Sequence, residues 1–540
     1  MPRKTTPSFV TEVPLIVNSA DNRELEARFR SGQQLLNAVL SEALIRMELV
    51  RNSEPYLQAK KLRGDKNKAL RKKLFEEARK LYRFSDFDLQ SFAVVTANSS
   101  KWIASKLDSN TIQKLATRAF KSVERALFGK AKKIRFKTFD RFKSVEGKTN
   151  KQGLRWTLRQ VKREETIGKK SDYRNKIKCS QYVLSWSGLE LEPIVDWFDP
   201  VIAHGLNSPV KYCRLVWRRL NGKKRWFLQL INEGLPYRKP QNYVTKGLVG
   251  LDLNISNIAF VADNKAGLLP FADKVPTFEK EIKAIQRKMQ RTQRIHNPEN
   301  YEADFEKKVG NRTVIKKGKV RKGRKKWNNS KSYLKLRRKK ADLERRKSSY
   351  AKSSNRRLVN KLLRHGDNFK TENVSVKSWQ KRYGKAISAK SPGFFQSELT
   401  RKAENAGGQL VKFSTKRTAL SQTHLDGSRI KKSLSQRVHE DVTGVRMHRD
   451  IFTAYLSRFV HDESLSIEDA ASQYSATEPL LVEGWEEYRK AAIKVSESEI
   501  RNSRVSLEQF STEGLSPESA TSQIVNKDEK LEVMPEPACL

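Results

Sequence analysis

Three carboxylates in the second half of the sequence stand where a purely structural element would not need them. Asp252 lies at the end of the strand-like run GLVGLDL, where a core strand would place another aliphatic residue. Glu372 ends the strand-like segment of GDNFKTENVSVKSWQ, and Asp450 falls in the first turn of an amphipathic helical pattern, RDIFTAYLSRF. Taken singly, Asp450 could be a charge stabilised by the helix macrodipole, and Glu372 could be an exposed loop residue. Their combination is the informative observation.

The chemistry open to such a set is metal-dependent hydrolysis of a phosphodiester. Asp, Glu and Asp follow one another on a first strand, a later strand and a final helix. This is the arrangement of an RNase H-like nuclease core, in which distant carboxylates converge on two Mg²⁺ ions about 3.5–4 Å apart. Mg²⁺ prefers oxygen ligands and retains water. We therefore expect Asp252, Glu372 and Asp450 to be catalytic and to bind two Mg²⁺ ions.

The elements around these residues belong to a strongly basic chain. Its 540 residues include 110 Lys and Arg against 60 Asp and Glu, a formal charge of +50. DNA or RNA is the expected partner, with a ribosomal-type protein or a membrane-surface binder as alternatives. No apolar run approaches transmembrane length, and the start MPRKTTPSFV lacks the apolar core of a signal peptide. A soluble intracellular protein without a membrane partner is expected.

The densest basic run covers residues 307–347, with 20 Lys or Arg and 2 acidic residues. Its first half has the glycine content of a flexible loop, and residues 330–363 have a long helical pattern. Such a run is often only a solvated surface. At this density, however, the positive charges repel one another strongly unless counterions are bound. Binding to phosphates releases those counterions, which favours a nucleic-acid role for the run. The residues expected to bind nucleic acid are Lys325, Lys326, Arg337, Arg338, Lys339 and Lys340.

The first half of the chain divides into helical and strand-like parts. A strand candidate, SFVTEVPLIV, precedes about a hundred residues of helical pattern, in which one apolar stripe consists of Leu35, Leu36, Val39, Leu40, Ala43 and Leu44. Residues 130–239 then contain short strand-like runs, KKIRFKTF, YVLSWSGLELEPIV, YCRLVWRRL and KRWFLQLIN, typical of a β-barrel or small sheet. Basic and aromatic residues alternate in RLVWRRLNGKKRWF. This pattern fits a nucleic-acid face and a half-buried strand with a solvated basic face equally well.

The end of the chain has the opposite charge. Residues 461–540 carry 17 acidic and 7 basic residues, a net charge of −10, against +60 for residues 1–460. This tail is rich in Ser, Glu and Thr, and LLVEGWEEYRKAAIKV is its one helical pattern. We expect a separate and mostly disordered unit, either a solubilising appendage or a regulatory segment.

Four stretches carry a resemblance to a known family. GLDLNISNIAF, GDNFKTENVSVKSWQ, SPGFFQSELTRKAENAGGQLVKFSTKRTALSQT and LSQRVHEDVTGVRMHRDIFTAYL together resemble the C-terminal half of the TnpB proteins of bacterial insertion sequences, relatives of the type V CRISPR effectors. The resemblance spans residues 247–459. It implies a RuvC-type nuclease that cuts DNA under the direction of a guide RNA encoded at the transposon end, with its triad at Asp252, Glu372 and Asp450. The first half resembles the family only in layout.

Together, these patterns and the resemblance predict an α+β multidomain protein. Its expected parts are a wedge-like β-barrel (1–20 and 126–245), an inserted helical recognition lobe (21–125), an RNase H-like RuvC nuclease core (246–415 and 445–460), a degenerate zinc-ribbon-like insertion (416–444) and an acidic tail (461–540). The implied partners are the guide RNA and a double-stranded DNA target, in the bacterial cytoplasm near the nucleoid. The oligomeric state is left open.

The zinc ribbon of the family is where this sequence departs from it. The expected Cys pairs are replaced in THLDG and VHEDVTG, so that His424, Asp426, Asp441 and Thr443 stand in place of thiolates. These residues make a much poorer tetrahedral zinc site. The chain's three cysteines, Cys179, Cys213 and Cys539, are widely spaced and supply neither a Cys-based zinc site nor a disulfide framework.

We therefore expect zinc to be absent and the loop to keep its shape through other contacts. The alternative is a hard-metal site at His424, Asp426, His439 and Asp441.

Three other functions compete with RNA-guided cutting. The first is a catalytically silent, guide-dependent DNA-binding protein, favoured by the degraded ribbon and opposed by the presence of all three carboxylates. The second is a miniature type V CRISPR effector, which a repeat array near the gene would favour. The third is a strand-transfer transposase, which the resemblance to the nuclease branch makes weaker.

Overall fold

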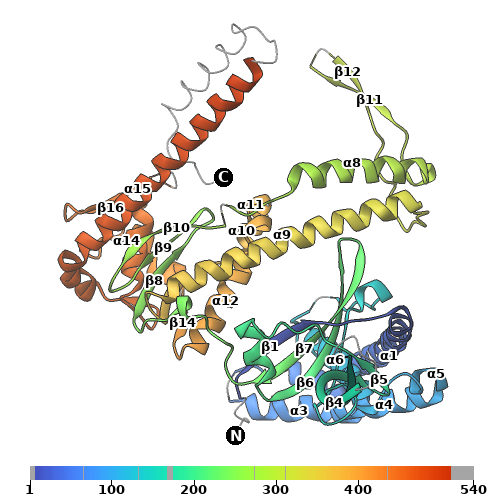
Figure 1. The fold of residues 1–540 in the computed structure, drawn as a ribbon. Helices are drawn as coiled ribbons and strands as arrows, with labels where there is room; N and C mark the ends of the chain where they lie inside the picture. Colours follow the sequence, from blue (N-terminus) through green and yellow to red (C-terminus); the bar gives the residue numbers. More distant parts are fainter. Residues whose placement is uncertain are drawn as a thin grey trace. The chain divides into compact units, whose positions relative to one another are not determined.

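The chain forms two compact units, Met1–Arg238 and Lys239–Leu540 (Figure 1). The structure is a computed structural model that describes residues 6–64, 66–131, 133–166, 174–272, 274–310, 312–433 and 436–511. Both units combine helices with sheets, so the expectation of a mixed α and β multidomain protein is confirmed. None of the helices in these ranges is long and apolar enough to cross a membrane.

The first unit contains two antiparallel sheets. One has the strand order β1 (Ser8–Pro14), β7 (Lys223–Glu233), β6 (Val210–Leu220) and β2 (Ser144–Glu146). The other joins β3 (Arg155–Thr166), β4 (Arg174–Trp186) and β5 (Leu189–Leu191). An isolated bridge between Leu15 and Pro193 connects the two. The described strands therefore do not form one closed sheet, and the barrel stays a prediction.

One strand expected in this unit is absent. Within KKIRFKTF, residues 133–138 form no strand, and a 3₁₀ turn, η1 (Phe139–Arg141), follows. A side chain of the first helix, α1 (Ser19–Asn52), takes the place of a partner strand here, because Asn37 accepts from the backbone N–H of Lys137 at 2.8 Å and donates to its carbonyl at 2.9 Å. The alternating apolar and basic residues at 133–138 therefore belong to an extended connecting segment and not to a strand.

Helices fill most of residues 19–127. They are α1 (Ser19–Asn52), α2 (Glu54–Lys61), α3 (Lys68–Leu81), α4 (Asp86–Ser99), α5 (Lys101–Ala104) and α6 (Ser109–Leu127), and a short α7 (Pro200–Leu206) lies among the strands. Asn18 and Asp21 form a capping box at the start of α1. Five of the six residues predicted for the apolar stripe are buried and Leu44 is partly buried, which confirms the helical period.

The second unit is built on a five-stranded sheet of order β10-β9-β8-β13-β14. These strands are β8 (Leu248–Leu253), β9 (Asn257–Val261), β10 (Ala266–Pro270), β13 (Asn368–Glu372) and β14 (Gln409–Phe413). β9 is antiparallel to both of its neighbours, whereas β8, β13 and β14 are parallel. The predicted strands around Asp252 and before Glu372 are confirmed.

Helices cover both faces of this sheet. On one face, α9 (Lys331–Leu363) and α12 (Pro392–Asn405) bury Leu362 and Leu399 against Val249 and Phe369. On the other, α14 (Arg449–Ser457) and α15 (Ile467–Ser511) pack against Val261 and its neighbours. The remaining elements near the sheet are α10 (Val376–Arg382), α11 (Gly384–Lys390), α13 (Thr415–Thr418), η4 (Leu420–Gln422), β15 (Val438–Glu440), β16 (Arg446–His448), β17 (Val460–His461) and β18 (Ser464–Leu465).

An insertion between β10 and β13 carries the basic run. Helix α8 (Glu279–Ile295) runs beside α9 (Figure 1), and Ser330 caps α9 by accepting a hydrogen bond from the N–H of Tyr333. Between these helices, η3 (Pro298–Asn300) precedes a hairpin of β11 (Phe305–Val309) and β12 (Arg312–Lys316), in which every residue is exposed. The structure thus has a β-hairpin where the sequence predicted a flexible loop. Gly310, with φ of 60°, permits its turn.

The acidic tail also differs from its prediction. The single short helix expected within residues 480–495 is part of α15, whose first half packs on β10 and buries Ala470, Tyr474 and Leu481. Gly484 is needed there, because a Cβ at this position would collide with the carbonyl oxygen of Ala266. The beginning of the tail therefore belongs to the second unit, and residues 512–540 lie outside the described residues.

Candidate functional site

Two neighbouring parallel strands bring Asp252 and Glu372 to one face of the sheet. Thr371 in β13 pairs with Leu251 in β8, so Glu372 and Asp252 are the next residue of each strand. Side chains alternate along a strand. Leu251 and Phe369 belong to the core beneath α9 and α12, which leaves Asp252 and Glu372 on the opposite face.

Helix α14 brings Asp450 to the same face. His448 precedes the helix and accepts a hydrogen bond from the N–H of Asp450 through Nδ1 at 3.2 Å. The helix approaches β8 closely, since a Cβ on Gly250 would collide with the carbonyl oxygen of Ala454. Asp450 is almost fully buried, and its Oδ2 accepts no hydrogen bond from any described residue.

Electrostatics tie the three acids together. The pKa of Asp252 is raised well above its ordinary value, first by burial, then by the charge of Asp450 and then by that of Glu372. Asn254 donates to Asp252 Oδ2 at 3.0 Å and opposes this rise. Burial raises the pKa of Glu372 to about 7, against a weaker effect of the Leu420 backbone. The fold thus concentrates negative charge that a cation would relieve.

Mg²⁺ fits these residues. The buried Oδ2 of Asp450 has a lone pair without a hydrogen bond, and its nearest cations are Arg449 Nε at 3.5 Å from Oδ1 and Arg437 Nη1 at 4.0 Å from Oδ2. The donor set is entirely oxygen, which Mg²⁺ prefers. Asp252, Glu372 and Asp450 are therefore the residues that would hold it.

A cleft of about 1230 Å³ adjoins the three acids. The acids are not among its lining residues, but the lining includes Asn373 and Arg449, which directly adjoin Glu372 and Asp450 in the sequence, and Asn254, two residues after Asp252. The other cationic residues of its wall are Arg382, Lys416, Arg417 and Arg437. The five cationic residues that line this cleft can hold a polyanion beside the buried acids.

Sequence reasoning missed these cleft cations. They come from α10, from α13, from the segment before β15 and from the first residue of α14, so only the fold brings them together. A signal was present for two of them, because Arg449 directly precedes Asp450 and Arg437 lies in the LSQR stretch that carries the resemblance.

The basic residues predicted to bind nucleic acid lie elsewhere, on the insertion. Arg337, Arg338 and Lys339 are exposed on α9, and Lys340 pairs with Glu344 at 2.7 Å. Lys325 and Lys326 precede the helix, and the carbonyl of Lys326 accepts from the side chain of Asn300 at 2.9 Å. None of these six residues lines the cleft beside the acids. Their role in binding stays a prediction.

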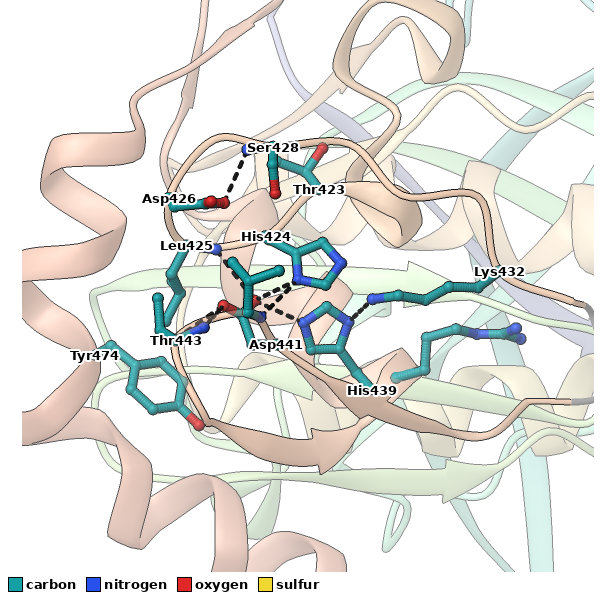
Figure 2. A network of polar contacts seen from close by, with 12 residues as sticks. Thr423, His424, Leu425, Asp426, Ser428, Lys432, His439, Asp441, Thr443 and Tyr474 are labelled. Atoms are coloured by element: carbon teal, nitrogen blue, oxygen red, sulfur yellow. Dashed lines mark hydrogen bonds and ion pairs between the residues drawn. The ribbon is translucent and has the colours of Figure 1, made fainter.

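The stretch that replaces the zinc ribbon is held by a buried carboxylate (Figure 2). Asp441 is 7% exposed and joins the two short loops of this stretch. From the first loop, the N–H of Leu425 donates to its Oδ2 at 3.1 Å. From the second, His439 Nε2 lies 2.8 Å from Oδ2, and the N–H and hydroxyl of Thr443 donate to Oδ1 at 3.1 and 2.9 Å. Asp441 therefore acts as the hub of a hydrogen-bond network.

Two histidines complete this hub. His424 Nδ1 lies 3.3 Å from Asp441 Oδ2 and accepts from the N–H of Val442 at 3.0 Å. His439 stacks on Phe452 of α14 and contacts Lys432 through Nδ1. Burial, helped by the charge of Lys432, lowers the pKa of His439 to about 4. The ring is thus neutral near pH 7.

This cluster groups three possible metal ligands. Among the described residues, His424, His439 and Asp441 each offer a ligand atom, and these atoms all lie within 4.8 Å of one another. Hydrogen bonds already occupy Nδ1 of His424, Nε2 of His439 and both oxygens of Asp441, but Nε2 of His424 is buried without a hydrogen-bond partner among the described residues. Asp426, the fourth residue of the alternative hard-metal site, is exposed and accepts from the N–H of Ser428 instead. The absence of zinc therefore stays a prediction.

Comparisons with known proteins give little further information. Neither a protein-family model nor a curated protein matches the sequence. One similar solved structure is a Cas12f1–sgRNA–target DNA complex, with 11% identity over 84% of this chain and 98% of that chain, and a TM-score of 0.43. A second is a CRISPR-Cas12f ternary complex, with 13% identity over 80% of this chain and 81% of that one, and a TM-score of 0.23. At these scores the likenesses carry no weight for fold or activity.

Proposed function

We propose that the chain is an RNA-guided DNA endonuclease of an insertion sequence that cuts its target by Mg²⁺-dependent, two-metal hydrolysis. The observation that carries the proposal is the meeting of Asp252, Glu372 and Asp450 on one face of the sheet, beside a cleft with cationic walls. The strand order β10-β9-β8-β13-β14, with the acids on β8, β13 and α14, supports an RNase H-like, RuvC-type core.

The chain's own residues suggest how the site works. Arg437 and Arg449 would bind the phosphate backbone and draw the scissile bond toward the acids. Asn254 orients the carboxylate of Asp252, and Gly250 lets α14 bring Asp450 close enough to share the site. When bound, Mg²⁺ supplies the charge that polarises the phosphodiester and activates water for in-line displacement. A bound cation would favour the deprotonated carboxylates of Asp252 and Glu372, whose pKa values the fold raises.

The guide RNA and the double-stranded DNA target are proposed from the motif resemblance to TnpB proteins, together with the net charge of +50. A nuclease and a strand-transfer transposase can share an RNase H-like core. Only the motif resemblance to TnpB proteins therefore favours the nuclease over the transposase.

A silent DNA-binding protein is the second candidate, and the lost zinc ligands favour it. The Asp441 hub weakens that argument, because the N–H of Leu425 and the ring of His424 in the first loop contact Asp441 in the second, so protein contacts join the two loops. Asp450 also has a lone pair without a hydrogen bond, which a purely structural carboxylate would not keep buried.

The test is cleavage by the full chain expressed with the DNA that flanks its gene. RNA that copurifies with the protein would be sequenced, and a plasmid carrying its matching target would be incubated with Mg²⁺. We expect cutting by the parent and none by Asp252→Asn. Asp263→Asn is the matched control, since Asp263 is an exposed aspartate just beyond β9 that pairs with Arg458.

Target binding without cutting by the parent would favour the silent protein. Cutting that needs no RNA would contradict guidance, and undiminished cutting by Asp252→Asn would remove Asp252 from the site.

A further inference from the structure

A pocket of about 450 Å³ lies in the helical part of the first unit, between the ends of α1 and α6 and the helices α2 and α3. Val50 and Leu127 are buried and form its floor. Tyr56 and Phe75 form an aromatic wall, with ring centroids 5.2 Å apart and planes inclined by 58°. Phe128 stands at the mouth with 55% of its surface exposed. The pocket is thus apolar within and has an accessible aromatic edge.

The rim of this pocket is cationic. Lys68, Arg71 and Lys72 line it on one face of α3, and neither Lys68 nor Arg71 makes an ion pair with a described residue. Lys72 lies 3.7 Å from Glu76, but both side chains are mostly exposed, so the pair holds little energy. Among the described residues, Lys68 and Arg71 have no ion-pair partner that would explain why these cations gather at the pocket, and the exposed pair of Lys72 with Glu76 is too weak to do so.

A fourth cation has a structural role instead. Arg79 binds Glu124 of α6 at 2.9 Å, and its guanidinium lies over the rings of Phe84 and Phe120. This contact fixes α3 against α6, so the pocket is held open by the fold and does not have to be formed by the ligand.

The chemistry of the pocket points to one kind of ligand. Its volume is within the range of small-molecule sites, and aromatic side chains receive unstacked bases. Cations at the mouth suit the phosphates on either side of such a base. A lipid or an apolar peptide would leave these cations without counter-charges. Glu76 would repel a phosphate but can accept a hydrogen bond from a 2′-hydroxyl, which favours RNA over DNA.

We propose that this pocket binds an unstacked base of single-stranded RNA, with its neighbouring phosphates on Lys68, Arg71 and Lys72. The inference rests on the proposed RNA partner, but it concerns a separate unit from the acids and makes no use of cleavage. Sequence patterns gave no sign of this site, because its lining is drawn from four helices, α1, α2, α3 and α6.

The experiment uses a short single-stranded RNA that carries one 4-thiouridine, mixed with the full chain and irradiated. Crosslinked peptides are identified by mass spectrometry. We expect a crosslink to Tyr56, Phe75 or Phe128. Phe128→Ala, an exposed change that should leave the fold intact, is expected to weaken that crosslink by about 5- to 100-fold, as loss of one base-stacking partner does.

Helix α3 also offers a matched pair of charge variants. Arg71→Gln with Lys72→Gln removes two rim cations, whereas Lys73→Gln with Lys80→Gln removes two exposed cations of the same helix that do not line the pocket. We expect the first pair to reduce crosslinking at the pocket and the second pair to leave it unchanged. An equal loss of crosslinking in both pairs of variants would mean that the overall positive charge, and not the pocket, binds the RNA.

The remaining outcomes separate this inference from the proposed function. RNA that crosslinks only outside α2, α3 and α6 would overturn the pocket and leave RNA binding standing. A parent that binds no RNA would overturn both. Equal crosslinking of a DNA strand would refute the choice of RNA, and equal crosslinking of an RNA duplex would refute an unstacked base.

Discussion

Replacing Glu372 with Gln is expected to make the metal-free protein more stable near pH 8. Burial raises the pKa of Glu372 from 4.5 to about 7, so folding favours its protonated form. The stability that this preference supplies is fully present below pH about 4.5 and is lost as the pH rises through about 7. Each pKa unit corresponds to about 1.4 kcal/mol, which gives a loss of up to about 3 kcal/mol.

Gln cannot ionise, so the variant avoids that loss. Its amide oxygen can still accept from the Leu420 backbone, which opposes the pKa rise of Glu372. Near pH 4.5 the two proteins should have the same free energy of unfolding, and near pH 8 the variant should be more stable by up to about 3 kcal/mol. Saturating Mg²⁺ should stabilise the parent, by about 2.7 kcal/mol at a hundredfold excess over Kd, and should affect the variant much less.

The measurement is urea unfolding read from hydrogen exchange of the amides in β8 and β13. This readout is local, which matters because the two units of the chain can unfold separately. Glu463→Gln is the control, since Glu463 is an exposed carboxylate of the same cleft that pairs with Arg417 at 2.6 Å. If the free energies of unfolding of Glu372→Gln and the parent differ by the same amount at both pH values, burial does not favour the protonated form of Glu372. The electrostatic account of the site would then be wrong.

Three other changes test the remaining parts of the structure. Asp252→Asn and Asp450→Asn should each abolish Mg²⁺-dependent cleavage with target binding retained, and the double variant should be little worse, because the acids act as one unit; additive losses would contradict this. Asp441→Asn should destabilise the ribbon-like stretch by at least about 2 kcal/mol, because the NH₂ group of the new amide would face hydrogen-bond donors. Elemental analysis of the parent protein should find well under one Zn²⁺ per chain, and stoichiometric zinc would refute a hub without metal. Gln at residues 337–340 should flatten the slope of log affinity against log salt by up to about three units, and an unchanged slope would make this part of α9 a solvated face.

The sequence predicted the elements that carry the acids. Strand and helix patterns around Asp252, Glu372 and Asp450 are local, and the structure has β8, β13 and α14 at those positions. Side-chain alternation then puts two of the acids on one face, a consequence that follows once β8 and β13 are neighbours. Which strands pair is a property of the whole sheet, and local pattern does not determine it.

The tail and the cleft were harder to predict, for different reasons. In α15, Ala470, Tyr474, Leu481 and Gly484 follow a helical period that acidic residues and Pro479 obscured. The cleft cations have no period at all, because they come from several segments that only the folded chain brings together. Local pattern identifies elements and their buried faces, whereas a cavity between elements depends on their packing.

The Asp441 hub has a consequence for the conditions in which this protein can fold. A thiolate ribbon must capture zinc from its surroundings and is open to oxidants that attack sulfur. Here the contacts that reach Asp441 from the first loop are the backbone N–H of Leu425 and the ring of His424, both supplied by the chain itself. If this stretch takes up no zinc, as we expect, the second unit should fold equally well in the presence of a zinc chelator or of an oxidant that attacks thiolates.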